Sequence, residues 1–81
     1  MPRVTVHVVD HNTGKPVDGA AVSIGGAAAY TVNGVAVLDA PAGMQTLTVT
    51  HSDYEAYSRP VYVYEGASFY VRLIPVAEIW R

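Results

Sequence analysis

The chain consists of short segments in which apolar and polar residues alternate, and each segment ends in a cluster of turn-forming residues. Val4, Val6 and Val8 recur with the period of two that is typical of a half-buried β-strand. No window has helical periodicity over the length that a helix needs. Strands this short and this closely spaced predict an all-β sandwich or a small barrel.

The stretch from Asp10 to Ile24 organises this pattern. Residues 10–14 are turn formers, because their side chains cap their own backbone or, at Gly14, tolerate a positive φ. Pro16 fixes φ and removes a donor, so we expect the chain there to stay extended and outside any central pairing. A strand containing Val22 and Ile24 follows. The strands before and after this turn therefore have to pack as two sheets.

The remaining turns divide the chain into about seven strands. Asn33-Gly34 is the strongest hairpin signal, because both positions accept a positive φ in a type I′ turn. The last two strands are expected to pair with each other, joined at Glu65-Gly66. The expected strands are residues 4–9, 21–25, 30–32, 35–38, 44–50, 57–64 and 68–74.

Composition narrows the function classes. With 81 residues the chain is one domain, and the absence of cysteine excludes a disulfide framework and a cysteine zinc site. A net charge of −2 with a single lysine argues against nucleic acid as a partner. The N-terminus alternates instead of forming a signal peptide, and no apolar run is long enough for membrane insertion.

The surface that this composition leaves is unusually poor in charge. Only 15% of residues are charged, against about 25% in ordinary soluble domains, while 51% are hydrophobic. Scattered exposed apolar residues are normal, so a weakly charged β surface is one interpretation. The alternative is that copies of the chain or a partner cover part of the surface.

Several turn and core residues resemble those of the carboxypeptidase regulatory-like domains, which have a transthyretin-like (prealbumin-like) sandwich. The resemblance covers roughly residues 4–74 and implies a seven-stranded Ig-like/prealbumin-like Greek-key β-sandwich. It also implies a non-catalytic role as a stalk, spacer, adhesion module or assembly subunit. The matching motifs consist of turn and core residues, which indicate the fold and not an activity. The matching residues are Asp10, Gly14, Pro16, Val17, Gly19, Ala20, Val22, Thr31, Asn33-Gly34, Pro41-Ala42-Gly43, Leu47-Val49 and Tyr54.

We expect the sandwich to occupy residues 1–75 and an apolar tail to occupy residues 76–81. The tail either folds back on its own domain or docks on a neighbouring subunit, where head-to-tail contact would build rings or filaments. If the last two strands pair, their outward side chains share one face with the composition of an interface. Cross-strand tyrosine pairing without a partner is the alternative. The predicted interface residues are Tyr62, Tyr64, Tyr70, Arg72, Ile79 and Trp80.

Catalysis is the less favoured class. His7-Val8-Val9-Asp10 is similar to the first motif of the 5-hydroxyisourate hydrolases, which share the transthyretin fold. However, Tyr70 stands about where those enzymes have a second histidine, and a single histidine does not place a general base beside water. Asp10, Asn12 and Asp18 offer the oxygens of a calcium loop, but that mixture is common in turns. We predict no enzyme activity, no catalytic residues, no metal and no cofactor.

The sequence thus predicts a non-catalytic structural module that self-associates as the subunit of a filament, sheath or other surface assembly. Copies of the chain are the expected partners, and the expected location is extracellular or at the cell surface. A carbohydrate- or protein-binding module is the competing hypothesis, in which exposed tyrosines and Trp80 stack on sugar rings. A 5-hydroxyisourate hydrolase-like enzyme is the remote alternative.

Overall fold

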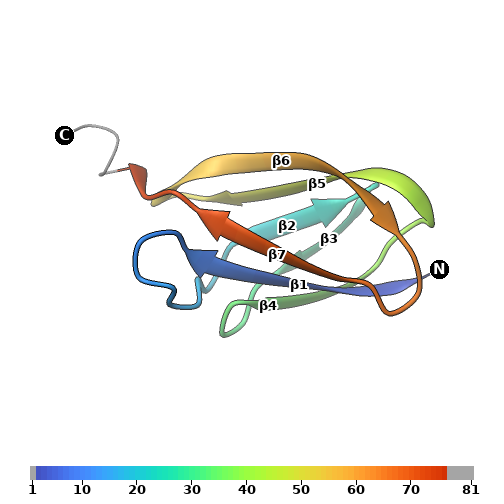
Figure 1. The fold of residues 1–81 in the computed structure, drawn as a ribbon, viewed down its shortest axis with the longest axis horizontal. Coiled ribbons are helices and arrows are strands. Elements are labelled where there is room, and N and C mark those ends of the chain that lie inside the picture. Colours follow the sequence, from blue (N-terminus) through green and yellow to red (C-terminus); the bar gives the residue numbers. More distant parts are fainter. Residues whose placement is uncertain (1, 77–81) are drawn as a thin grey trace.

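The computed structural model describes residues 2–76, which form a sandwich of two β-sheets (Figure 1). One sheet has the strand order β4-β1-β7, and the other has the order β3-β2-β5-β6. All neighbouring strands are antiparallel except β1 and β7, which run parallel. The predicted seven-stranded all-β sandwich is confirmed. The strands are β1 (Arg3–Asp10), β2 (Ala21–Ile24), β3 (Ala27–Tyr30), β4 (Val35–Asp39), β5 (Gly43–His51), β6 (Tyr54–Val63) and β7 (Ser68–Leu73).

The core lies between the two sheets and follows the alternation read from the sequence. Val4, Val6 and Val8 on β1 are fully buried, and Leu47 and Val49 on β5 close the core from the other sheet. Burying an aliphatic side chain of this size contributes about 1.5–3 kcal/mol relative to leaving it exposed. The alternating valines therefore fix which face of each strand points inward.

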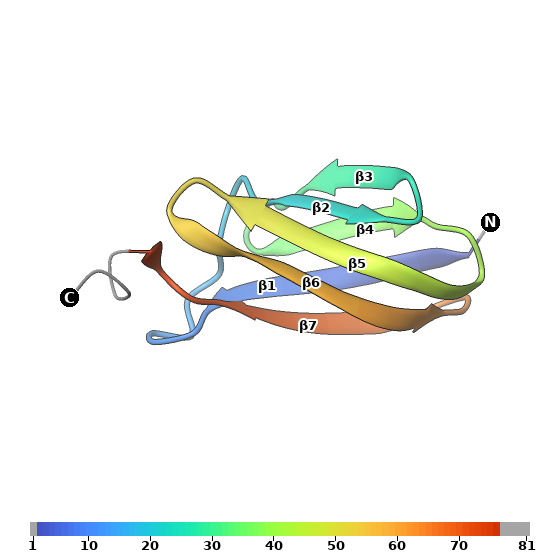
Figure 2. The same ribbon diagram turned by 90° about the horizontal axis from the view of Figure 1, so that it is seen from above.

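The Asn33-Gly34 turn has the predicted backbone, with φ of 54° and 78°. The N–H groups of Val32 and Val35 donate to each other's carbonyls at 2.9 and 3.1 Å, as in a two-residue hairpin. However, β3 and β4 belong to different sheets, so this turn carries the chain from one sheet to the other (Figure 2).

The third strand is Ala27–Tyr30, and the prediction of residues 30–32 was displaced toward the C-terminus. The alanines pair with β2 after a turn at Gly25-Gly26. Thr31 is buried, and its hydroxyl accepts from the Ala20 N–H at 2.9 Å and donates to the Val17 carbonyl at 2.7 Å. The small side chains of Ala27 and Ala29 are partly buried and pack against the core.

The predicted pairing of the last two strands is wrong. β6 pairs with β5, whereas β7 crosses to the other sheet and pairs with β1. In this register Val71 lies beside Val8 and extends the buried valine surface of β1. The Glu65-Gly66 turn therefore links the two sheets, as the Asn33-Gly34 turn does on the opposite side.

The chain returns to β6 after β7 ends. The Glu55 N–H donates to the Ile74 carbonyl at 2.9 Å, and the Val76 N–H donates to the Asp53 carbonyl at 3.0 Å. Val76, the first residue of the expected tail, is thus hydrogen-bonded to the sandwich. Residues 77–81, which include Ile79 and Trp80, lie outside the described residues.

Candidate interface surfaces

The tyrosines of the predicted interface are exposed but do not share one face. Tyr62, Tyr64 and Tyr70 have exposed fractions between 56% and 75%. Tyr62 lies on β6, opposite the exposed Met44 of β5, and therefore belongs to the outer face of the four-stranded sheet. Tyr70 and the exposed Arg72 lie on β7, on the outer face of the three-stranded sheet. The predicted single face was wrong because β6 and β7 do not pair.

Tyr70 makes a specific contact with β1. Its ring stacks on the ring of His7, with centroids 4.6 Å apart and planes 8° apart, because these residues are register partners. Since β7 is an edge strand and Tyr70 is 75% exposed, the described residues leave uncovered the ring face of Tyr70 that points away from His7. His7 is thereby held as a stacking partner of Tyr70.

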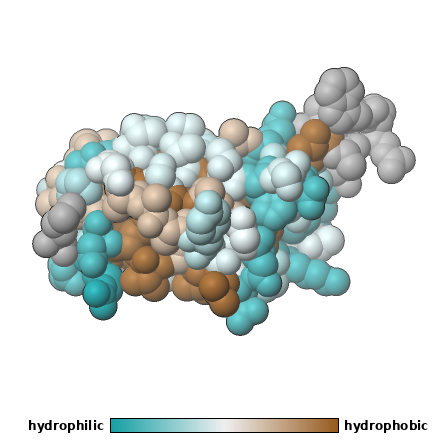
Figure 3. Space-filling model, turned by 180° about the vertical axis from the view of Figure 1, so that it is seen from behind, coloured by the Kyte–Doolittle hydropathy of each residue, from teal (hydrophilic) through white to brown (hydrophobic). Residues whose placement is uncertain are grey.

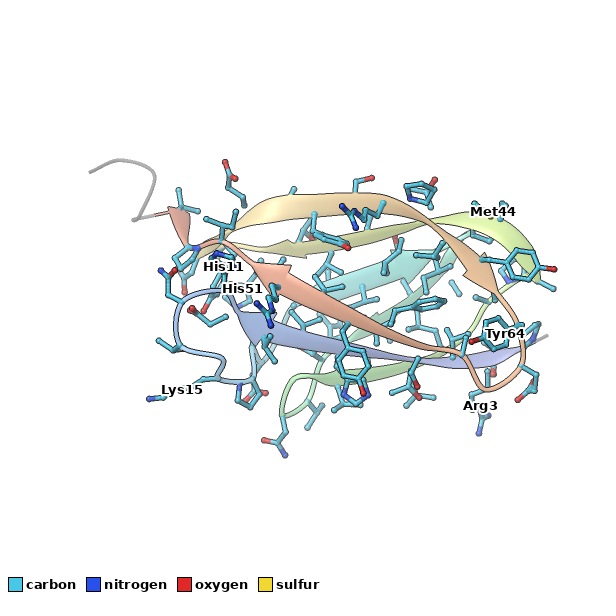
Figure 4. The ribbon with its side chains drawn as sticks, viewed as in Figure 1. Arg3, His11, Lys15, Met44, His51 and Tyr64 are labelled. Carbon is cyan, nitrogen blue, oxygen red and sulfur yellow. The ribbon has the colours of Figure 1, made fainter. Side chains whose placement is uncertain are left out.

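Tyr62 and Tyr64 lie near the end of the sandwich where β6 passes into the turn before β7. Their ring centroids are 6.4 Å apart at a tilt of 33°. Figure 4 places Met44, Tyr64 and Arg3 at this same end. Charged groups border it, since Glu65 accepts from the Arg3 N–H at 3.2 Å and the Arg3 side chain pairs with Asp39 at 3.2 Å.

The polar cluster at the opposite end holds loops in place. One carboxylate oxygen of Asp10 accepts from the N–H groups of Asn12 and Thr13, and the other accepts from the Tyr54 hydroxyl at 2.8 Å. The bond from Tyr54, together with these backbone bonds, holds the pKa of Asp10 below its ordinary value. The same bond to Asp10 raises the pKa of Tyr54.

Asp18 and His51, also at this end, make hydrogen bonds to the backbone as well. Asp18 accepts from the Gly34 N–H at 3.2 Å. The His51 Nδ1 accepts from the Asp53 N–H at 3.0 Å, so its Nε2–H donates to the Asp18 carbonyl at 3.1 Å. Among residues 2–76 no group of three or more histidine or acidic side chains is arranged to hold a metal ion.

A further surface, which the sequence analysis did not identify, lies where β3 and β4 form neighbouring edges. Tyr30, Val32 and Val37 have exposed fractions between 52% and 72%. Figure 3 views the molecule from this side and shows hydrophobic side chains gathered over it. We call this surface the β3–β4 face. It is the side of the sandwich along these two edges, where Ala28 and Tyr30 belong to the four-stranded sheet, Val35 and Val37 belong to the three-stranded sheet, and Val32 lies in the turn between them.

The signal for this surface is present in the sequence. No charged residue occurs between Asp18 and Asp39, and that interval contains β3, the turn after it, and β4 as far as Leu38. An edge strand without charge is exposed to pairing with another chain. Total charge alone could not locate the surface, because the edges are defined only by the strand order.

Comparisons with known proteins support the fold. No protein family and no curated protein matches the chain. A chain of a mutant type II cohesin–X–dockerin complex from Acetivibrio cellulolyticus matches with a TM-score of 0.73 and 20% identity, over 91% of this chain and 56% of that chain. A putative membrane-associated protein of unknown function from Bacteroides fragilis matches with a TM-score of 0.68 and 21% identity, over 91% and 28%.

The third similar structure is the C-terminal domain of the Caf1A usher, whose surface hydrophobic clusters are described as important for F1 antigen assembly. It matches with a TM-score of 0.55 and 14% identity, over 90% of this chain and 97% of that chain. The chain thus spans about half of the first similar structure and about a quarter of the second. At these identities the likeness concerns the fold. Within residues 2–76 no helix has the length and hydropathy needed to cross a membrane.

Proposed function

We propose that the chain is a non-catalytic module that acts by associating with protein surfaces, copies of itself included, as the subunit of a filament, sheath or other surface assembly. The observation that supports this most directly is the β3–β4 face, where exposed apolar side chains lie along two strand edges that, apart from the bridge between Val32 and Val35, have no partner among the described residues. A surface of this kind stabilises an assembly when it is covered and promotes aggregation when it is not.

Two of the similar structures come from proteins described by their association with other proteins, namely a cohesin–X–dockerin complex and an usher domain in F1 antigen assembly. That agrees with the proposal. We further propose membership of the carboxypeptidase regulatory-like domains and an extracellular or cell-surface location. The turn that contains Asp10 and the Asn33-Gly34 crossing support the family proposal, because they position the residues of the resemblance.

The test is the native mass of the purified protein by light scattering over a range of concentrations, with negative-stain microscopy. We expect species larger than the 8.6 kDa monomer, and Val32→Lys should dissociate them. Tyr62→Lys, at a similarly exposed site on β6, is the matched control and should leave the mass unchanged. A monomer at every concentration contradicts the proposal.

The tyrosine and tail hypotheses have their own outcomes in the same experiment. Loss of large species in Tyr62→Lys alone would assign the contact to the predicted tyrosine interface. Loss on deletion of residues 77–81, which contain Ile79 and Trp80, would assign it to the tail.

A glycan-binding module is the second candidate, because the uncovered ring face of Tyr70 beside Arg72 suits stacking on a sugar. In that case Tyr70→Ala lowers retention on a polysaccharide column without changing the native mass. Equal retention of the wild-type protein and of Tyr70→Ala would exclude Tyr70 as a glycan-binding site.

A further inference from the structure

The strand β3 has an unpaired edge whose hydrogen-bonding groups can be assigned from its register. Among residues 2–76, β3 pairs only with β2, and Figure 2 shows it at the outside of its sheet. The Thr31 N–H donates to the Ala20 carbonyl at 3.0 Å, next to the register pair of Ala21 and Tyr30. Successive residues of a strand direct their N–H and C=O groups to opposite sides. The N–H and C=O groups of Ala29 therefore point toward β2, like those of Thr31, and the groups of Ala28 and Tyr30 point toward the free edge.

We propose that a second copy of the chain pairs with this edge, β3 antiparallel to β3, across a two-fold axis beside Ala29; this inference rests on the proposed function. Ala28 of each copy then lies opposite Tyr30 of the second copy. Each of these pairs can exchange both of its N–H···O bonds, and the large Tyr30 side chain lies beside a small alanine.

The charge pattern favours a second copy as the occupant. A two-fold axis places side chains near their own counterparts, so any charge close to the axis would face a like charge. β3 and its flanking residues contain no charge, because the interval from Asp18 to Asp39 has none. Self-pairing at β3 therefore costs no like-charge repulsion.

The other edges are less suited to pairing. β6 contains Pro60, which lacks an N–H, and β7 carries Arg72 near its C-terminal end and leads into the return to β6. On β4, the N–H and carbonyl of Val35 already bond to Val32, which leaves Val37 as the central free residue. β3 offers two free residues in the register that self-pairing needs.

The absence of cysteine allows a direct test with single-cysteine variants. Residue 29 of each copy would form a non-hydrogen-bonded pair with Cα atoms about 4.5 Å apart, within the range for a disulfide. Residue 27 would lie about 13 Å from its counterpart, at about 3.3 Å per residue. Both positions are partly buried alanines of the same strand, so Ala27→Cys is a matched control.

Under mild oxidation we expect Ala29→Cys to form a covalent dimer at least about tenfold faster than Ala27→Cys, measured on non-reducing gels. Equal rates, or no cross-link while the native mass exceeds 8.6 kDa, overturn β3 pairing and leave the proposed function standing. A wild-type monomer at every concentration overturns both.

If Ala29→Cys does not fold, charge variants replace it. Ala28→Lys should reduce the native mass, whereas Ser58→Lys, also exposed on the outer face of this sheet but at its opposite edge, should not. An unchanged mass in Ala28→Lys overturns the inference.

Discussion

The sandwich has two sides with edge strands, one bounded by β6 and β7 and the other by β3 and β4. On each side, two edge strands are exposed to pairing with another chain. On the β6–β7 side, Tyr57, Val61 and Phe69 are half-buried and fill the gap between the sheets. The hydrogen bond from the Glu55 N–H to the Ile74 carbonyl closes one end, and Pro60 interrupts the outer edge.

The β3–β4 side is closed by small side chains instead. Ala27 and Ala29 on β3 pack against the core, as the buried Ala36 on β4 does, and the exposed positions before Asp39 are apolar. Proline and charge hinder the approach of another chain, and both are missing from these two strands up to Asp39. The difference indicates that one side is protected against pairing and the other is available for it.

The largest expected effect concerns the turns that join the sheets on the two sides. A Cβ at Gly34 would lie 2.6 Å from the Pro16 Cβ and 2.8 Å from the Val8 carbonyl oxygen, at a φ of +78°. Gly66, with a φ of +82°, has no atom of the described residues within 4 Å of its own Cβ position. We expect Gly34→Ala to lower the free energy of unfolding by about 3 kcal/mol, and Gly66→Ala by about 1 kcal/mol.

Denaturant unfolding of both variants measures this difference. Equal losses would show that the β3–β4 crossing is no more tightly packed than the β6–β7 crossing, and the contrast drawn between the two sides would fail for their turns.

The next effect concerns the hydrogen bond that anchors the start of β6. The pKa of Asp10 is lowered, so its contribution to stability is present above an ordinary carboxyl pKa of about 4 and is lost as the pH falls through the folded value. The pKa of Tyr54 is raised, so its contribution is present below an ordinary tyrosine pKa of about 10 and is lost as the pH rises through the folded value.

Tyr54→Phe should therefore lower Tm by a few degrees near neutral pH and flatten both limbs of the profile of Tm against pH. Tyr57→Phe, on the same strand, is the control and should keep both limbs. An unchanged acid limb in Tyr54→Phe would mean that this bond does not couple the loop after β1 to β6.

The sequence was sufficient for the strands whose side chains alternate strictly. Val4, Val6 and Val8 lie in the core, as their alternation predicts, because a period of two leaves only one choice of buried face. The Asn33-Gly34 turn was also correctly predicted, because few residue pairs accept a positive φ at both positions.

Strand partners could not be obtained in the same way. A short turn such as Glu65-Gly66 can return the chain within one sheet or carry it across to the other, and the local residues are similar in both cases. The predicted tyrosine face depended on that choice, so Tyr62 and Tyr70 were placed together although they lie on different sheets. The β3–β4 face was missed for the same reason, since an edge is a property of the whole sheet order.

The smallest expected effect concerns Pro60, which hinders pairing of another chain with the free edge of β6. Pro60 lies opposite Thr46, and a proline fits there because its nitrogen faces the free edge of the sheet. Pro60→Thr adds one donor to that edge, which is worth about 1 kcal/mol when paired, or about a fivefold change in Kd. The variant should keep the wild-type free energy of unfolding to within about 0.5 kcal/mol and gain weak association through β6.

Because wild-type association at β3 would obscure that gain, the change is best measured in a background that contains Ala28→Lys. Light scattering should then detect more dimer in the protein with both substitutions than in Ala28→Lys alone. If the two proteins have the same mass at every concentration, Pro60 is not what keeps β6 unpaired. The charged residues Glu55, Arg59 and Arg72 would then be what prevents pairing on the β6–β7 side. In that case, neutralising these three residues should make the β6–β7 side as available for pairing as the β3–β4 side.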